Sequence, residues 1–240
     1  MAANQLAQSV RAQLGIGRVL PLGGPADGSW ITERAAVGAL RATARTPAGV
    51  RVGTLRLSVA DPGRAPEPAV PAPPSALPPG PLRIEADFAA VAGRPLPAVA
   101  DQVRTALLEA SVRELGLVVG VVDLRVGALL AEDEEPPPPA APAQEPAAVP
   151  AADDRSGATQ EGPAGITAVA REVPGVARLA PVLGGRSRAV RRTDGHVLIQ
   201  LATAPGHRAL DVSCAVRRAV AATPAAPSTV AVLVTAVEQH

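Results

Sequence analysis

The side chains that could perform acid–base, nucleophilic or metal chemistry are few in this sequence and far apart. Its three histidines are His196, His207 and His240, and their spacing matches no metal-ligand motif. Cys214 is the only cysteine, so neither an intramolecular disulfide nor a cysteine metal cluster can form. Two arginines follow Cys214, but the sequence places no base beside it, and its position on a helical pattern predicts a surface thiol. We therefore expect no catalytic residue and no metal site.

Nucleotide and calcium binding are also poorly supported. The chain contains no lysine, so Gly15-Ile16-Gly17 and Gly184-Gly185 lack the phosphate-loop lysine. The acidic run 132–135 leads directly into the prolines 136–139, without the alternating ligands and the glycine of a calcium loop. We expect a solvated charge run and no cofactor.

Arginines in the last third of the chain are the one set that could form a binding surface. One basic face there could contact phosphate on RNA or on anionic lipid. All 23 basic residues of the chain are arginine, and this bias, with abundant Ala, Gly and Pro, is typical of a high-GC bacterial genome. An arginine-rich surface can thus follow from codon usage alone, and residues 164–240 lack the aromatic side chains on which single-stranded RNA usually stacks. The candidate phosphate or partner contacts are Arg186, Arg188, Arg191, Arg192, Arg217 and Arg218, with Arg208 extending the set.

The clearest structural unit lies between residues 82 and 130. Apolar and polar residues alternate from Leu82 to Phe88, which predicts a strand with one buried face. The period becomes helical over 98–115, Gly116 suits a left-handed helix end, and a second strand follows over 122–128. The residues on the predicted buried face of the helix are Val99, Val103, Ala106, Leu107 and Ala110.

Before this unit, Thr32 is a good N-cap for a helix that stops before Pro47, and Glu33 suits the positive end of that helix. A strand with Leu55, Leu57 and Val59 on one face follows. Residues 61–81 contain nine prolines without a periodic pattern, and we expect an extended, solvated insertion between two strands.

The C-terminal part repeats this order in shortened form. Ile166-Thr167 opens a helix with room for about two turns, as Ile31-Thr32 opens the first one. Asp194-Gly195 is a strong signal for a two-residue hairpin. The pair Val99/Val103 recurs as Val212/Val216 at an offset of 113 residues, and 230–236 alternates as a closing strand. Both parts therefore run helix, strand, strand, helix, strand.

Together these patterns predict an α/β fold of the two-layer α+β type with two independently folding domains. Residues 18–130 and 164–240 are the predicted domains, preceded by an amphipathic helix over 1–17. The segment 131–163 has one arginine and eight acidic residues, net −7, and is expected to be a disordered linker.

Four features occur in both parts of the chain. An Ile-Thr pair begins the first helix, a Gly-Val pair follows it (Gly49-Val50 and Gly175-Val176), the second helix has valines spaced by four, and the last strand is rich in valine. With these features the sequence resembles the alkaline-shock-protein (envelope stress response) family in two tandem divergent copies. The resemblance implies a non-enzymatic stress or scaffold protein. It implies a cytoplasmic location, with membrane association only through a partner, and no run of about 20 apolar residues is present to span a membrane. The expected partners are other proteins, including a second copy or a membrane-anchored protein. An RNA- or anionic-lipid-binding module is the alternative, and an enzyme is a third class without a supporting cluster.

Overall fold

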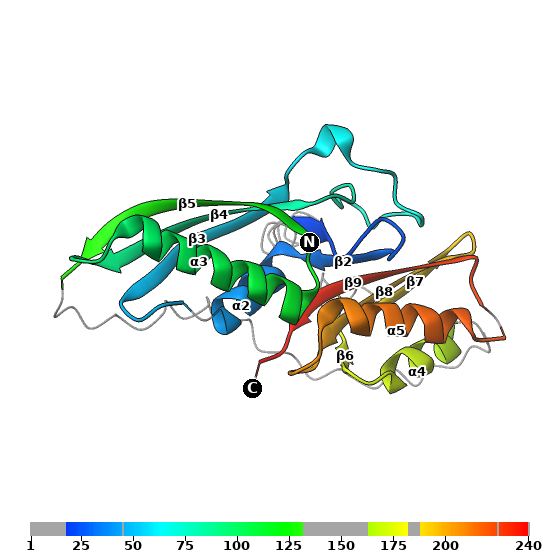
Figure 1. Ribbon diagram of the computed structural model, residues 1–240. Helices are drawn as coiled ribbons and strands as arrows, with labels where there is room; N and C mark the ends of the chain where they lie inside the picture. The colour runs from blue at the N-terminus through cyan, green and yellow to red at the C-terminus, as the bar shows by residue number, and fades with distance from the viewer. Residues whose placement is uncertain (1–17, 45, 132–162, 182–187, 225, 240) are drawn as a thin grey trace, which may run out of the picture.

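Helices and strands are both present, as expected, and the strands form two sheets that lie side by side with helices on the same side of each (Figure 1). One continuous hydrophobic core runs beneath both sheets. The computed structural model describes residues 18–44, 46–131, 163–181, 188–224 and 226–239. The expected helix over 1–17, nearly all of the expected linker, Arg186 and His240 lie outside the described residues.

Sheet B, the three-stranded sheet, belongs to the N-terminal part and has the order β3-β4-β5. β3 pairs with β4 antiparallel, and β4 pairs with β5 parallel. The buried residues of α3 are the five expected from the helical period, and Gly116 has a φ of +80° after the π-helical turn η2. The elements are α2 (Glu33–Thr43), β3 (Val50–Val59), the short 3-10 helix η1 (Pro62–Arg64), β4 (Leu82–Val91), α3 (Leu96–Ala110), η2 (Ser111–Leu115) and β5 (Val119–Leu130).

The C-terminal part has the same order of elements and the same strand directions. β6 pairs with β8 antiparallel, β8 pairs with β9 parallel, and β7 also pairs with β8, so the counterpart of β3 is split in two. Asp194 and Gly195 have φ values of +47° and +79°, as their hairpin turn requires. The elements are α4 (Pro163–Glu172), β6 (Val176–Leu179), β7 (Val190–Thr193), β8 (His196–Thr203), α5 (Ala209–Ala221) and β9 (Thr229–Val237).

An N-terminal hairpin pairs with the last strand of the C-terminal part. The strands β1 (Val19–Pro21) and β2 (Ser29–Thr32) precede α2 in sequence, yet β2 pairs with β9 in parallel. Sheet A therefore has the order β1-β2-β9-β8-β6, with β7 on β8. Pairing with β2 covers the edge of the valine-rich β9, and Ile31 is fully buried in the shared core.

Glu33 connects β1 to β3 at the point where the sheets meet. Its carboxylate accepts the backbone amides of Leu57 at 3.1 Å and of Arg18 at 3.3 Å. The guanidinium of Arg18 donates to the Leu57 carbonyl at 3.0 Å. Glu33 lies in the first turn of α2, as expected. It is also buried, and its oxygens accept hydrogen bonds from backbone donors that no strand reaches.

The proline-rich insertion 61–81 is not simply an extended, solvated loop, because part of it packs across the face of sheet A opposite the helices (Figure 1). Val70 is 7% exposed and lies against Trp30, which is 2% exposed. The amide of Leu77 donates to the carbonyl of Val19 at 2.8 Å. Trp30 and Val70 form a second, smaller core that covers sheet A on this side.

Candidate interaction surface

β5 is a long strand with one free edge. It spans 12 residues, Val119–Leu130, and pairs with β4 on one side. Within the described part of the chain, no strand pairs with its other side. A free edge presents unpaired backbone amides and carbonyls that can hydrogen-bond to another strand.

The other outer strands of the two sheets are short or have side chains bonded to their backbones. On β3, the groups of Leu57 are bonded by Glu33 and Arg18, and Arg41 donates to the Gly53 carbonyl at 2.7 Å. β1, at one end of sheet A, is three residues long, and β6 and β7 are four residues each. β5 is thus the longest outer strand in the described part of the chain, with 12 residues against 10 in β3.

Large apolar side chains are exposed along the same segment. Val126 is 46% exposed, although its partner in the register, Phe88, is only 2% exposed. Leu129 is 61% exposed. The helix layer therefore covers β4 fully but β5 only in part, since Val122 and Leu124 are half-buried against the core while Val126 is exposed. We expected Val126 to lie on a buried strand face, and that expectation is wrong, because its side chain is exposed to solvent. The large hydrophobic residues that are exposed in the described chain are Val112, Val118, Val126 and Leu129.

The opposite face of β5 carries charge. Asp123 lies 2.5 Å from Arg83 of β4, and Arg125 lies across from Asp87 in the register. The ladder shifts by one residue around Gly120 and again around Gly127, so the regular part of the strand is 121–126. Glycines inside a strand often mark such irregularities, so Gly120 and Gly127 were the signal in the sequence that this strand is not a regular buried one.

The strand of the C-terminal part that corresponds to β5 has a further strand paired with its outer edge. β9 occupies the same place in the C-terminal part as β5 does in the N-terminal part, parallel to the middle strand. The edge of β9 is paired with β2, with Trp30 opposite Leu233. In this fold the last strand of the repeat thus takes an additional strand when one is supplied.

The candidate arginines that the structure describes do not all lie on one face. Arg191 and Arg192 pair with Leu198 and Val197, so they point to opposite faces of sheet A. Arg217 donates to the carbonyls of Val230 at 3.0 Å and Ala26 at 3.1 Å, and also to that of Asp27. Arg217 is therefore a structural clamp between α5 and the β1–β2 turn. Of the remaining candidates in the described chain, the exposed ones are Arg188 and Arg218.

Cys214 is half-buried rather than exposed as expected, and its Sγ lies 3.9 Å from Asp27 Oδ1. Burial raises the pKa of the Cys214 thiol, and the Asp27 carboxylate raises it further. A raised pKa keeps the sulfur protonated at neutral pH, which is the opposite of what a nucleophile needs.

The two described histidines lie at opposite ends of β8. His196 Nδ1 is 2.8 Å from Thr229 Oγ1, and burial lowers the pKa of its imidazole. His207 is exposed. The described residues contain no group of three or more histidine, cysteine, aspartate or glutamate side chains placed to hold a metal ion.

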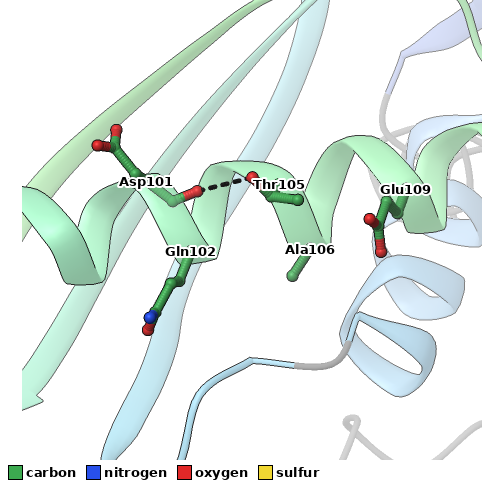
Figure 2. Close-up of a pocket in the computed structure, with 5 residues that line it drawn as sticks. All are labelled: Asp101, Gln102, Thr105, Ala106 and Glu109. Carbon is green, nitrogen blue, oxygen red and sulfur yellow. Dashed lines mark hydrogen bonds between the residues drawn. The ribbon is translucent and has the colours of Figure 1, made fainter.

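A hollow of about 320 Å³ lies along α3, and all of its lining residues come from that helix (Figure 2). Thr105 donates its hydroxyl to the carbonyl of Asp101 at 3.0 Å, so it offers no free donor to a ligand. A small-molecule site needs enclosing apolar walls and converging polar groups, and one helix surface supplies neither. The lining residues are Asp101, Gln102, Thr105, Ala106 and Glu109.

No helix in the described ranges is both long enough and apolar enough to cross a membrane. The chain matches no protein-family model, and no curated protein or solved structure is significantly similar to it.

Proposed function

We propose that the protein is a non-catalytic scaffold of the alkaline-shock type, which binds other proteins by adding one of their strands to β5. The observation that carries this proposal is the open 12-residue edge of β5, beside side chains of Val126 and Leu129 that are 46% and 61% exposed. Backbone hydrogen bonds along such an edge provide affinity, and the apolar side chains beside it provide specificity.

The repeated order helix, strand, strand, helix, strand supports the family assignment, which is itself part of the proposal. We further propose a cytoplasmic location, with membrane contact only through a bound partner. Arg217 is held by backbone carbonyls, and Arg191 and Arg192 lie on opposite faces, so no observation favours the phosphate-binding alternative.

Site-specific photo-crosslinking tests the proposal. A benzoylphenylalanine at position 126 is expected to capture partner proteins, whereas the same residue at exposed position 56 of β3 is expected to capture none. Substitution of Val126 by proline in a chain crosslinked from position 129 should abolish capture, because proline blocks strand pairing. Equal capture from positions 56 and 126 would contradict the proposal.

A further inference from the structure

We propose that β5 pairs with β5 of a second copy of this chain, antiparallel and about a two-fold axis through Leu124. Two three-stranded sheets would then join into one continuous sheet. This inference rests on the proposed function, because it assigns an occupant to the same edge.

The exposed apolar side chains determine how the two copies face each other. Val126 and Phe88 share a register position, so Val126 lies on the helix side of sheet B. Burial of this side chain against the second copy requires both helix layers to lie on the same side of the joined sheet. The two-fold axis is then perpendicular to the sheet, and each residue must oppose a residue that points to the same face.

Charge then selects one register. With the axis through Leu124, Asp123 of each copy lies opposite Arg125 of the other, and Val122 lies opposite Val126. An axis through Asp123 or Arg125 would place each of those residues opposite its own copy, and like charges directly across from each other destabilise a sheet. The run 122–126 is thus its own complement in one antiparallel register, within the regular part of the strand.

The same pairing explains the uneven cover of the sheet. Val126 would pack on Val122 of the second copy, and both lie on the face that the helices leave incompletely covered along β5. In an isologous dimer the same surface patch of both copies forms the interface, so no other patch of the chain has to complement it.

Two single charge reversals test this register. Sedimentation of the intact chain should show a concentration-dependent dimer. Asp123→Arg and Arg125→Asp, each alone, should be monomers, because each creates two like-charge pairs across the axis. A mixture of the two variants should restore a dimer, because every cross-strand pair is then opposite in charge. Thermal melts establish that each variant is folded.

A disulfide provides a second readout that leaves the charges unchanged. In a Cys214→Ala background, Leu124→Cys should form a disulfide between copies on mild oxidation. Val126→Cys should not form this disulfide. Position 126 of one copy lies opposite position 122 of the other, so the two introduced cysteines are four residues apart along the paired strands.

A chain that stays monomeric at every concentration, or a dimer that the charge reversals do not dissociate, overturns self-pairing. If position 126 still crosslinks other proteins in that case, the proposed function stands; if it crosslinks nothing, that function falls as well.

Discussion

The hydroxyl of Thr32 lies 3.3 Å from the carbonyl oxygen of Thr235, and this hydrogen bond joins residues 203 positions apart. The hydroxyl oxygen of Thr32 also accepts a hydrogen bond from the backbone amide of Ala35 at 3.3 Å and so caps α2. Thr235 in turn donates to the carbonyl of Ala180 at 2.8 Å. One side chain thus begins a helix of the N-terminal part and holds the last strand of the C-terminal part.

Replacement of Thr32 by valine should therefore cost more than the loss of a helix cap. Valine has nearly the same shape but removes both the cap and the bond to Thr235, and we expect a loss of about 1–2 kcal/mol in the free energy of unfolding. Thr32→Ser keeps the hydroxyl and is the matched control. Urea denaturation of both variants measures the difference, and equal losses would contradict the double role.

Local patterns in the sequence were enough to predict several elements. The period of α3 predicted its five buried residues, Asp194-Gly195 predicted its turn, and Thr32 was predicted as the N-cap. Each of these features is decided by residues within a few positions of one another, so periodicity and capping chemistry identify them.

What could not be predicted depends on contacts between distant segments. β1 and β2 have three and four residues, too few to show alternation, and the partner of β2 is β9, roughly 200 residues later. The open edge of β5 was also hidden, because Val122, Leu124 and Val126 alternate as buried residues do. Val122 and Leu124 are half-buried and only Val126 is exposed, and this difference depends on how far the helix layer extends, which no local pattern encodes.

Arg217 was expected to be one of several phosphate contacts, and the structure gives a different expectation for its removal. Arg217→Ala should destabilise the protein by about 1–3 kcal/mol, because it leaves carbonyls of the β1–β2 turn without their donor. Arg218→Ala, at an exposed position, should change stability by less than about 0.5 kcal/mol. Thermal melts compare the two. Equal stability, with loss of RNA or lipid binding in the Arg217 variant alone, would support the phosphate-binding alternative.

Val103 lies at the centre of the shared core and is fully buried. Val103→Asp should cost several kcal/mol, because it places an unpaired carboxylate among aliphatic side chains. The neighbouring Arg104 makes a partly exposed ion pair with Asp101 at 2.6 Å, so Arg104→Ala should cost less than about 1 kcal/mol. Similar losses in chemical denaturation would show that the buried face of α3 is misassigned.

His196 should make stability depend on pH in mildly acidic solution. Burial lowers the pKa of its imidazole in the folded state below the value of about 6.5 found in unfolded chains. The unfolded state therefore binds more protons as pH falls below about 6.5, and the folded state loses stability until its own lower pKa is reached. His196→Gln should show a smaller drop in melting temperature between pH 7 and pH 5. An identical drop in both proteins would exclude a contribution from His196.

A cut between the two parts of the chain should leave them bound to each other. β2 supplies the neighbour of β9, Ile31 fills the core beneath sheet A, and Arg217 clamps α5 to the β1–β2 turn, so neither part buries its core alone. We expect a chain cleaved at a protease site inserted after Gln144 to remain one particle on gel filtration and to unfold in a single transition.

The separate fragments provide the control for this cut. Residues 1–130 and 164–240, produced singly, should lack a cooperative melt, because each exposes apolar surface that the other covers. Mixed during refolding, they should regain the circular dichroism spectrum and the melting transition of the cleaved chain. Two fragments that separate after cleavage and melt independently would instead establish the two autonomous domains that the repeat alone predicts.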